Sequence, residues 1–99
     1  MKKAAPRAPR FRGAPVDFVV DVRSKLEFWM GHLPGAVCIE VDELPAGLER
    51  RGASPDSHIL LYCATGIRSA NAADQLRAAG FKHVVDGGGM SDTWNYYVP

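Results

Sequence analysis

The sequence of 99 residues has no long hydrophobic run. No stretch approaches the roughly eighteen consecutive apolar residues that a membrane-spanning helix needs. The start of the chain is basic but lacks the apolar segment of a secretory signal peptide. We therefore expect a protein that has no membrane partner and stays in the cytoplasm. A periplasmic location is the alternative if a signal peptide has been removed.

Metal-binding and nucleotide-binding motifs are also missing. The two cysteines, Cys38 and Cys63, and the three histidines form no C-x-x-C, H-x-x-x-H or similar local pair. No G-x-G-x-x-G follows the first expected strand, and no G-K-[ST] follows a glycine run. We therefore expect no metal, no cofactor and no disulfide framework. A reducing compartment would keep a cysteine thiolate available for reaction.

Charges of both signs are present but unevenly placed. The first twelve residues carry five basic side chains and no acidic one, whereas the others carry seven basic and eleven acidic side chains, a net charge of −4. Because the start is basic and rich in proline, we expect residues 1–14 to be a flexible tail and residues 15–99 to be one domain. A nucleic-acid-binding domain usually has its basic patch on the folded surface, so we expect no nucleic-acid partner.

Strand and helix patterns alternate along the rest of the chain. Strands are predicted at residues 16–22, 36–39, 59–62 and 84–85, and helical segments at residues 24–30, 40–52, 67–79 and 91–94. Ser24 and Glu27 have the spacing of a capping box, and Asp42 is the expected cap of the second helix. Residues 96–99 are expected to be loosely held. The alternation predicts an α/β fold with a mainly parallel central sheet and helices on both faces.

The segment from His58 to Ser69 carries the candidate chemistry. A buried strand over residues 59–62 places Cys63 at its end, and a helix is expected after a short turn. Unpaired backbone N–H groups at such a turn favour an anion, and Arg68 adds a positive charge. These conditions lower the pKa of a thiol, so Cys63 is predicted to be a nucleophile. The structural alternative is a small buried side chain at a strand end.

Four motifs resemble those of the single-domain rhodanese sulfurtransferases. The loop Cys63–Ser69 resembles the family's C-x-x-G-x-R-S active-site loop. Three further signatures occur in the expected order: Asp21-Val22-Arg23, residues 31–36, and residues 87–89 with Trp94. The resemblance covers about residues 16–94. Many family members have an extra strand and helix before the D-V-R strand, so the short start here is most similar to the phage-shock-protein-E type.

The resemblance implies a sulfurtransferase that needs no cofactor. Cys63 would take a sulfur atom from a small anionic donor, which is thiosulfate or a polysulfide or persulfide, and pass it to cyanide or a thiol, including a protein thiol. The substrate-binding loop would consist of Ala64, Thr65, Gly66, Ile67, Arg68 and Ser69. Asp21 and Arg23 are expected to form a structural ion pair, with support of the cysteine loop as the alternative. His32 is expected to be a hydrogen-bonding brace, and Cys38 to be inert.

The length of the loop separates two classes of enzyme. Cysteine-dependent phosphatases and arsenate reductases use C-x5-R, in which five residues cradle a tetrahedral oxyanion, whereas Cys63 and Arg68 enclose four. The smaller ring leaves room for one sulfur atom, which favours sulfur transfer over phosphate hydrolysis. A non-catalytic rhodanese-like module that binds a partner is the third interpretation. The presence of both Cys63 and Arg68 argues against it.

Overall fold

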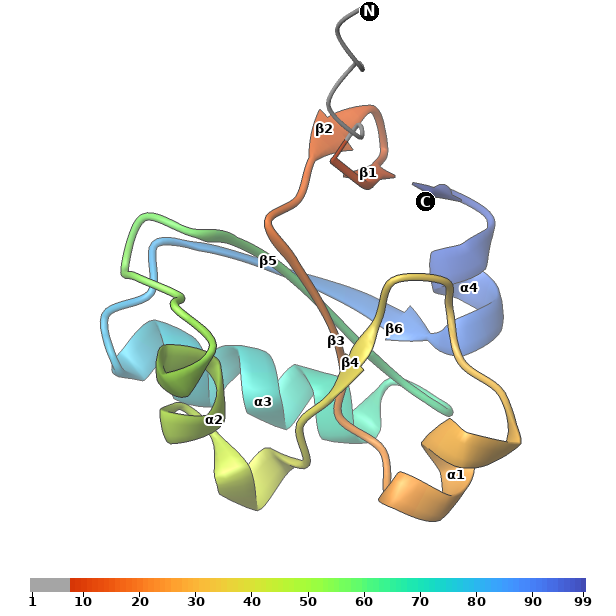
Figure 1. Ribbon diagram of the computed structural model, residues 1–99, viewed down its shortest axis with the longest axis horizontal. Helices are drawn as coiled ribbons and strands as arrows, with labels where there is room; N and C mark the ends of the chain where they lie inside the picture. Colours follow the sequence, from red (N-terminus) through yellow and green to blue (C-terminus); the bar gives the residue numbers. More distant parts are fainter. Residues whose placement is uncertain (1–7) are drawn as a thin grey trace, which may run out of the picture.

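The main sheet of the protein consists of four parallel strands, as the sequence predicts (Figure 1). The computed structural model describes residues 8–99. The strands lie in the order β4-β3-β5-β6, and their bounds are Val37–Cys38 (β4), Phe18–Asp21 (β3), His58–Cys63 (β5) and His83–Gly89 (β6). A second, antiparallel sheet has the order β2-β1-β7, with bounds Ala14–Pro15 (β2), Arg10–Phe11 (β1) and Tyr97–Val98 (β7).

Helices cover both faces of the main sheet. One face packs against α3 (Ile67–Ala78), α2 (Ala46–Arg50) and the 3-10 turn η1 (Val41–Glu43), while α4 (Met90–Trp94) lies on the other. Helix α1 (Lys25–Met30) buries none of its residues and lies beyond the carboxyl end of β3 (Figure 1). No helix within residues 8–99 has both the length and the hydropathy that crossing a bilayer requires.

The central strand β5 decides where the cysteine points. Neighbouring residues of a strand face opposite sides of the sheet, so Leu60 and Leu61 enter different cores. Ile59, Leu61 and Cys63 belong to the core under α3, whereas Leu60 and Tyr62 belong to the core on the opposite face. Alternation along β5 therefore directs the Cys63 thiol to the face that α3 covers.

The prediction that residues 1–14 form a tail outside the domain is wrong from Arg10 onward, and so is the prediction that residues 96–99 are loosely held. Strand β1 pairs with β2 and also with β7, so the two ends of the described chain meet. Phe11 and Tyr97 are both buried in this sheet, and the Arg12 guanidinium lies 3.9 Å from the centre of the Tyr96 ring. Residues 1–7 of the predicted tail lie outside the described residues.

Two further element predictions need correction. Glu40, not Asp42, occupies the N-cap position of η1, and the expected helical connection over residues 40–52 is interrupted at Leu44 before α2 begins. Pro45 explains the interruption, because proline has no N–H to continue a helical ladder. Strand β6 is longer than expected and includes all three glycines of residues 87–89. The glycine run is therefore part of the sheet beside β5 and not a turn after it.

Candidate active site

The loop after β5 surrounds the Cys63 sulfur with hydrogen-bond donors. The thiol is completely buried at the base of the loop. The backbone N–H of Gly66 donates to Sγ at 2.9 Å, and that of Ser69 donates at 3.4 Å. The Ser69 hydroxyl lies 3.5 Å from Sγ. Cys63 therefore sits where the sequence predicts an anion-binding loop and helix start.

This environment lowers the pKa of Cys63. Burial alone would raise the pKa of the thiol, because it disfavours the charged form. Hydrogen bonds from the Ser69 side chain and from the backbone N–H groups of Ser69, Gly66 and Thr65 outweigh burial, so the pKa lies below that of an ordinary thiol. The thiolate, which is the nucleophilic form, is thus stabilised by the protein.

We expect Ser69→Ala to raise the pKa of Cys63, because the side chain of Ser69 gives the largest of the stabilising hydrogen bonds. Alkylation of Cys63 by iodoacetamide near neutral pH should become about three- to tenfold slower, because the lost contact is a long hydrogen bond of 3.5 Å, for which about 0.7–1.4 kcal/mol is expected. The pH midpoint of the rate should move upward. The measurement uses a Cys38→Ser background, so that only one thiol reacts. An unchanged midpoint would mean that the backbone N–H groups alone set the pKa.

Glycines allow β6 to approach the cysteine loop closely. Gly66 has φ +101°, a left-handed conformation that favours glycine, and a Cβ on it would lie 3.5 Å from the α-carbon of Gly88. A Cβ on Gly89 would lie 2.8 Å from the carbonyl oxygen of Ala64. The Ser69 hydroxyl also lies 3.4 Å from the carbonyl oxygen of Gly88. The glycine run therefore lets the backbone of β6 approach the cysteine loop.

Arg68 forms an ion pair with Glu27, a residue for which the sequence predicts only a helix-capping role. Its Nη1 and Nη2 donate to Glu27 Oε1 and Oε2 at 2.7 and 3.0 Å. The Glu27 carboxylate also accepts the backbone N–H of Ser24, which completes the predicted capping box of α1. Glu27 and Arg68 are 41 positions apart, so no local pattern links them. The guanidinium is therefore held beside the loop as half of an ion pair.

Asp21 and Arg23 form the predicted ion pair at the end of β3. Arg23 Nη2 donates to Asp21 Oδ2 at 2.7 Å, and both side chains are buried. A second bond, from Arg23 Nη2 to the carbonyl oxygen of Gly31 at 2.6 Å, ties the end of β3 to the chain after α1. The pair thus braces the neighbouring segment, and a role in orienting the cysteine loop stays a prediction.

His32 and Cys38 lie outside the cysteine loop. The Nδ1 of His32 is 2.8 Å from the carbonyl oxygen of Phe28, and the two rings stack with centroids 3.6 Å apart. This contact is the predicted hydrogen-bonding brace. Cys38 is half-buried on β4, and burial raises the pKa of its thiol, so less of it is ionised than of an ordinary thiol. That Cys38 is inert stays a prediction.

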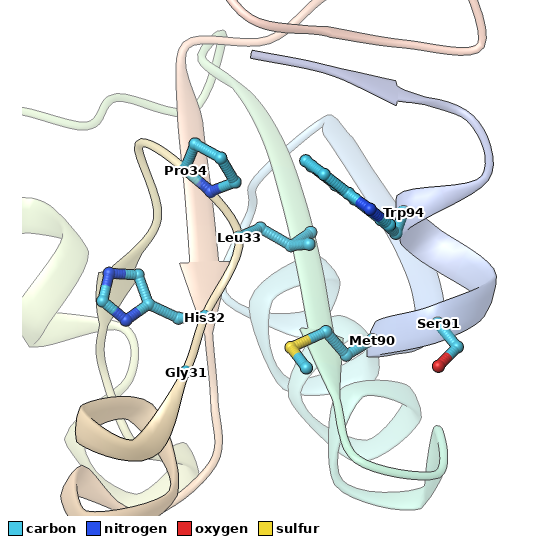
Figure 2. A pocket seen from close by; sticks show the side chains of 7 residues that line it. All are labelled: Gly31, His32, Leu33, Pro34, Met90, Ser91 and Trp94. Carbon is cyan, nitrogen blue, oxygen red and sulfur yellow. The ribbon is translucent and has the colours of Figure 1, made fainter.

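An apolar cleft of about 400 Å³ lies between the segment after α1 and helix α4 (Figure 2). Its lining residues are Gly31, His32, Leu33, Pro34, Met90, Ser91 and Trp94. The cleft is close to the cysteine loop, because Met90 follows Gly89, which pairs with Cys63 across β5 and β6. No sequence pattern indicates that Met90 and Ser91 belong to a site, whereas Trp94 belongs to one of the four motifs. Within residues 8–99, no three His, Cys, Asp or Glu side chains gather as a metal site would require.

The fold and the loop define an α/β domain built around a cysteine whose sulfur accepts backbone N–H bonds. Comparison with known proteins names this class. Residues 7–93 match the rhodanese-like domain family, and the chain belongs to this family.

Solved structures of rhodanese-like proteins share the fold. A rhodanese with anions from Escherichia coli superposes with a TM-score of 0.74 at 26% identity, and the match covers 82% of this chain and 95% of that one. A rhodanese-like domain protein from Staphylococcus aureus has a TM-score of 0.66 at 36% identity, with 81% and 74% covered. A human single-domain sulfurtransferase has a TM-score of 0.66 at 27% identity, with 79% and 80% covered.

Curated proteins that match the chain are named for hydroxylation and not for sulfur transfer. The chain is similar to the tRNA uridine(34) hydroxylase of Sodalis glossinidius, with 36% identity over 80 residues, and to that of Listeria welshimeri, with 37% identity over 81 residues. Each match covers 75% of this chain but only 23% and 25% of those proteins. The chain therefore spans about a quarter of the length of the curated relatives it matches.

Proposed function

We propose that the protein is a sulfurtransferase in which Cys63 carries a sulfur atom as a persulfide. The observation that supports this most is the buried Sγ, which accepts the N–H groups of Gly66 and Ser69. These donors suit a sulfur anion at the base of the loop, and the loop of four residues between Cys63 and Arg68 has little space for a larger oxyanion. Membership of the rhodanese-like family agrees with this chemistry.

The proposed first step is attack of the Cys63 thiolate on the outer sulfur of thiosulfate. The sulfur–sulfur bond of the donor breaks, its electron pair leaves with sulfite, and Cys63 becomes a persulfide anion. Charge balances, because the thiolate and the thiosulfate dianion give the persulfide anion and the sulfite dianion. In the second step cyanide or a thiolate attacks the outer sulfur of the persulfide, which regenerates the Cys63 thiolate. No general base is needed, since the nucleophile is already ionised.

The donor class can be ranked by steady-state kinetics. With cyanide as the acceptor, we expect thiosulfate and polysulfide to support turnover and 3-mercaptopyruvate to be the poorest donor, because the loop has no cation besides Arg68 to hold a carboxylate. Thiocyanate formation from thiosulfate is measured by its coloured iron complex. If mercaptopyruvate were the best donor, the assignment of donors to this loop would be wrong.

A role in hydroxylation of a tRNA uridine is the second candidate. The identity of 36–37% to tRNA uridine(34) hydroxylases favours it, although the match covers about a quarter of those proteins. The two candidates differ in substrate, so nucleoside mass spectrometry of tRNA from cells with and without the protein separates them. A hydroxylated uridine that depends on the protein, and on Cys63, would favour this candidate. Unchanged tRNA together with thiocyanate formation in vitro would favour sulfur transfer.

A further inference from the structure

Every cationic side chain on the elements that meet at the cysteine loop is bonded to a carboxylate. At the start of α3, Arg68 bonds to Glu27 through both terminal nitrogens. At the end of β3, Arg23 bonds to Asp21 through Nε and Nη2. On α1, Lys25 bonds to glutamates 40 and 43. Each of these positive charges is therefore neutralised by a neighbouring carboxylate.

Acidic side chains lie on the other side of the loop. Asp92 Oδ2 would be 3.6 Å from a Cβ on Gly89, the residue that contacts the loop carbonyl of Ala64. Asp86 accepts the backbone N–H of Gly88 at 2.9 Å. Neither aspartate forms an ion pair within residues 8–99. The side chains around the loop thus have a net negative charge. Only the backbone N–H groups of the loop provide a positive potential that counters this charge.

The Glu27 carboxylate is fixed in its position and in its charge. It accepts bonds from Arg68, from the backbone N–H of Ser24 and from the Ser24 hydroxyl. The bond to Arg68, followed by that to Ser24, lowers the pKa of Glu27 to about 2. Glu27 therefore stays ionised at every pH at which the enzyme can be assayed, and it cancels the charge of Arg68 throughout that range.

We propose that Glu27 determines donor specificity: by neutralising Arg68 it makes the loop favour a sulfur donor with one negative charge over a dianionic donor of the same shape, such as thiosulfate. This inference rests on the proposed sulfurtransferase function and narrows its substrate class. A monoanionic donor feels less repulsion from the acidic side chains, while the loop N–H groups serve both kinds of donor equally. Persulfides, which carry one charge on their sulfur, fit this requirement.

Two donors of nearly the same shape test the proposal. Thiosulfate and methanethiosulfonate both transfer their outer sulfur by breaking one sulfur–sulfur bond, and they leave as sulfite and methanesulfinate. A methyl group replaces one charged oxygen, so the second donor has one negative charge fewer. The wild-type protein should have the higher kcat/KM with methanethiosulfonate, with the difference mainly in KM. Raised ionic strength should narrow that difference, because salt screens the repulsion.

The decisive variant is Glu27→Gln, because glutamine also serves at the third position of a capping box. It removes the negative charge and keeps one of the two oxygens that accept bonds from Arg68. We expect its kcat/KM for thiosulfate to rise about three- to tenfold relative to that for methanethiosulfonate, the size expected for one screened charge near the donor. Asp92→Asn should shift the ratio in the same direction, so a folding defect in the first variant leaves a second test. Asp74→Asn is the matched control. It also removes a carboxylate from an arginine pair, but two turns along α3 from the loop.

The outcomes separate this proposal from the function on which it rests. A donor ratio that changes in Glu27→Gln and not in Asp74→Asn supports the role of Glu27. If Cys63 accepts sulfur from both donors but the ratio is unchanged, or both rates fall equally, Glu27 only holds the loop and the specificity proposal is wrong. If Cys63 accepts sulfur from neither donor, the sulfurtransferase function fails and the specificity proposal fails with it.

Discussion

Cys63→Ser should abolish sulfur transfer to cyanide and leave the fold intact. The hydroxyl of serine can accept the same N–H bonds from Gly66 and Ser69, and the change in volume is small. A serine hydroxyl is not ionised near neutral pH and cannot form a persulfide, so the covalent route is lost. We expect thiocyanate formation to fall at least about 10³-fold, the scale of loss when a nucleophile is removed.

Cys38→Ser provides the control for this result. Cys38 is half-buried on β4, and its pKa is raised, so its replacement should leave turnover near the wild-type rate. Circular dichroism of both variants should match that of the wild type. If activity survived in Cys63→Ser but were lost in Cys38→Ser, Cys38 would be the nucleophile and the assignment to Cys63 would be wrong.

Asp21→Ala should give the largest loss of stability among the charged residues of the site. Asp21 is fully buried, and its carboxylate binds both the side chain and the backbone N–H of Arg23. Removing it leaves a buried guanidinium without its counter-charge, a change that costs about 3–5 kcal/mol of unfolding free energy. Urea denaturation followed by circular dichroism measures the loss.

The double variant Asp21→Leu with Arg23→Met separates the contribution of the charge pair to stability from that of side-chain packing. Apolar residues of similar volume often replace a buried ion pair with little loss, because neither charge must then be desolvated. We therefore expect the double variant to be more stable than Asp21→Ala. A cost below about 1 kcal/mol for Asp21→Ala would contradict the buried-pair account and would be typical of a surface pair.

The parts of the site that the sequence predicted are local in the chain. The apolar run of β5, the turn at Gly66 and the periodicity of α3 are all within about twenty residues, and together they place Cys63 under a helix start. The capping box of α1 is equally local, since Ser24 and Glu27 are one helical turn apart. In such segments, the residues that form the sequence pattern are also the ones that contact each other in the structure. The pattern therefore predicts the contacts.

The features that the sequence did not reveal join distant parts of the chain. Strand β1 pairs with β7, which lies at the other end of the chain, and a strand of two residues has no periodicity to detect. The Glu27–Arg68 pair joins α1 to α3 in the same way. The sequence predicts that Arg68 adds a positive charge to a turn that favours an anion, and it shows no partner for that charge. The observed partner of Arg68 changes that expectation and is the basis for the proposed donor specificity.

The central claim is that Cys63 accepts a sulfur atom, and peptide mass spectrometry tests it most directly. The protein is treated separately with thiosulfate and with methanethiosulfonate, unreacted thiols are blocked, and the peptides that contain Cys63 and Cys38 are compared. We predict a gain of one sulfur atom on Cys63 alone, lost again on addition of cyanide with release of thiocyanate. An unmodified Cys63 with both donors, or added sulfur on Cys38 instead, would contradict the account.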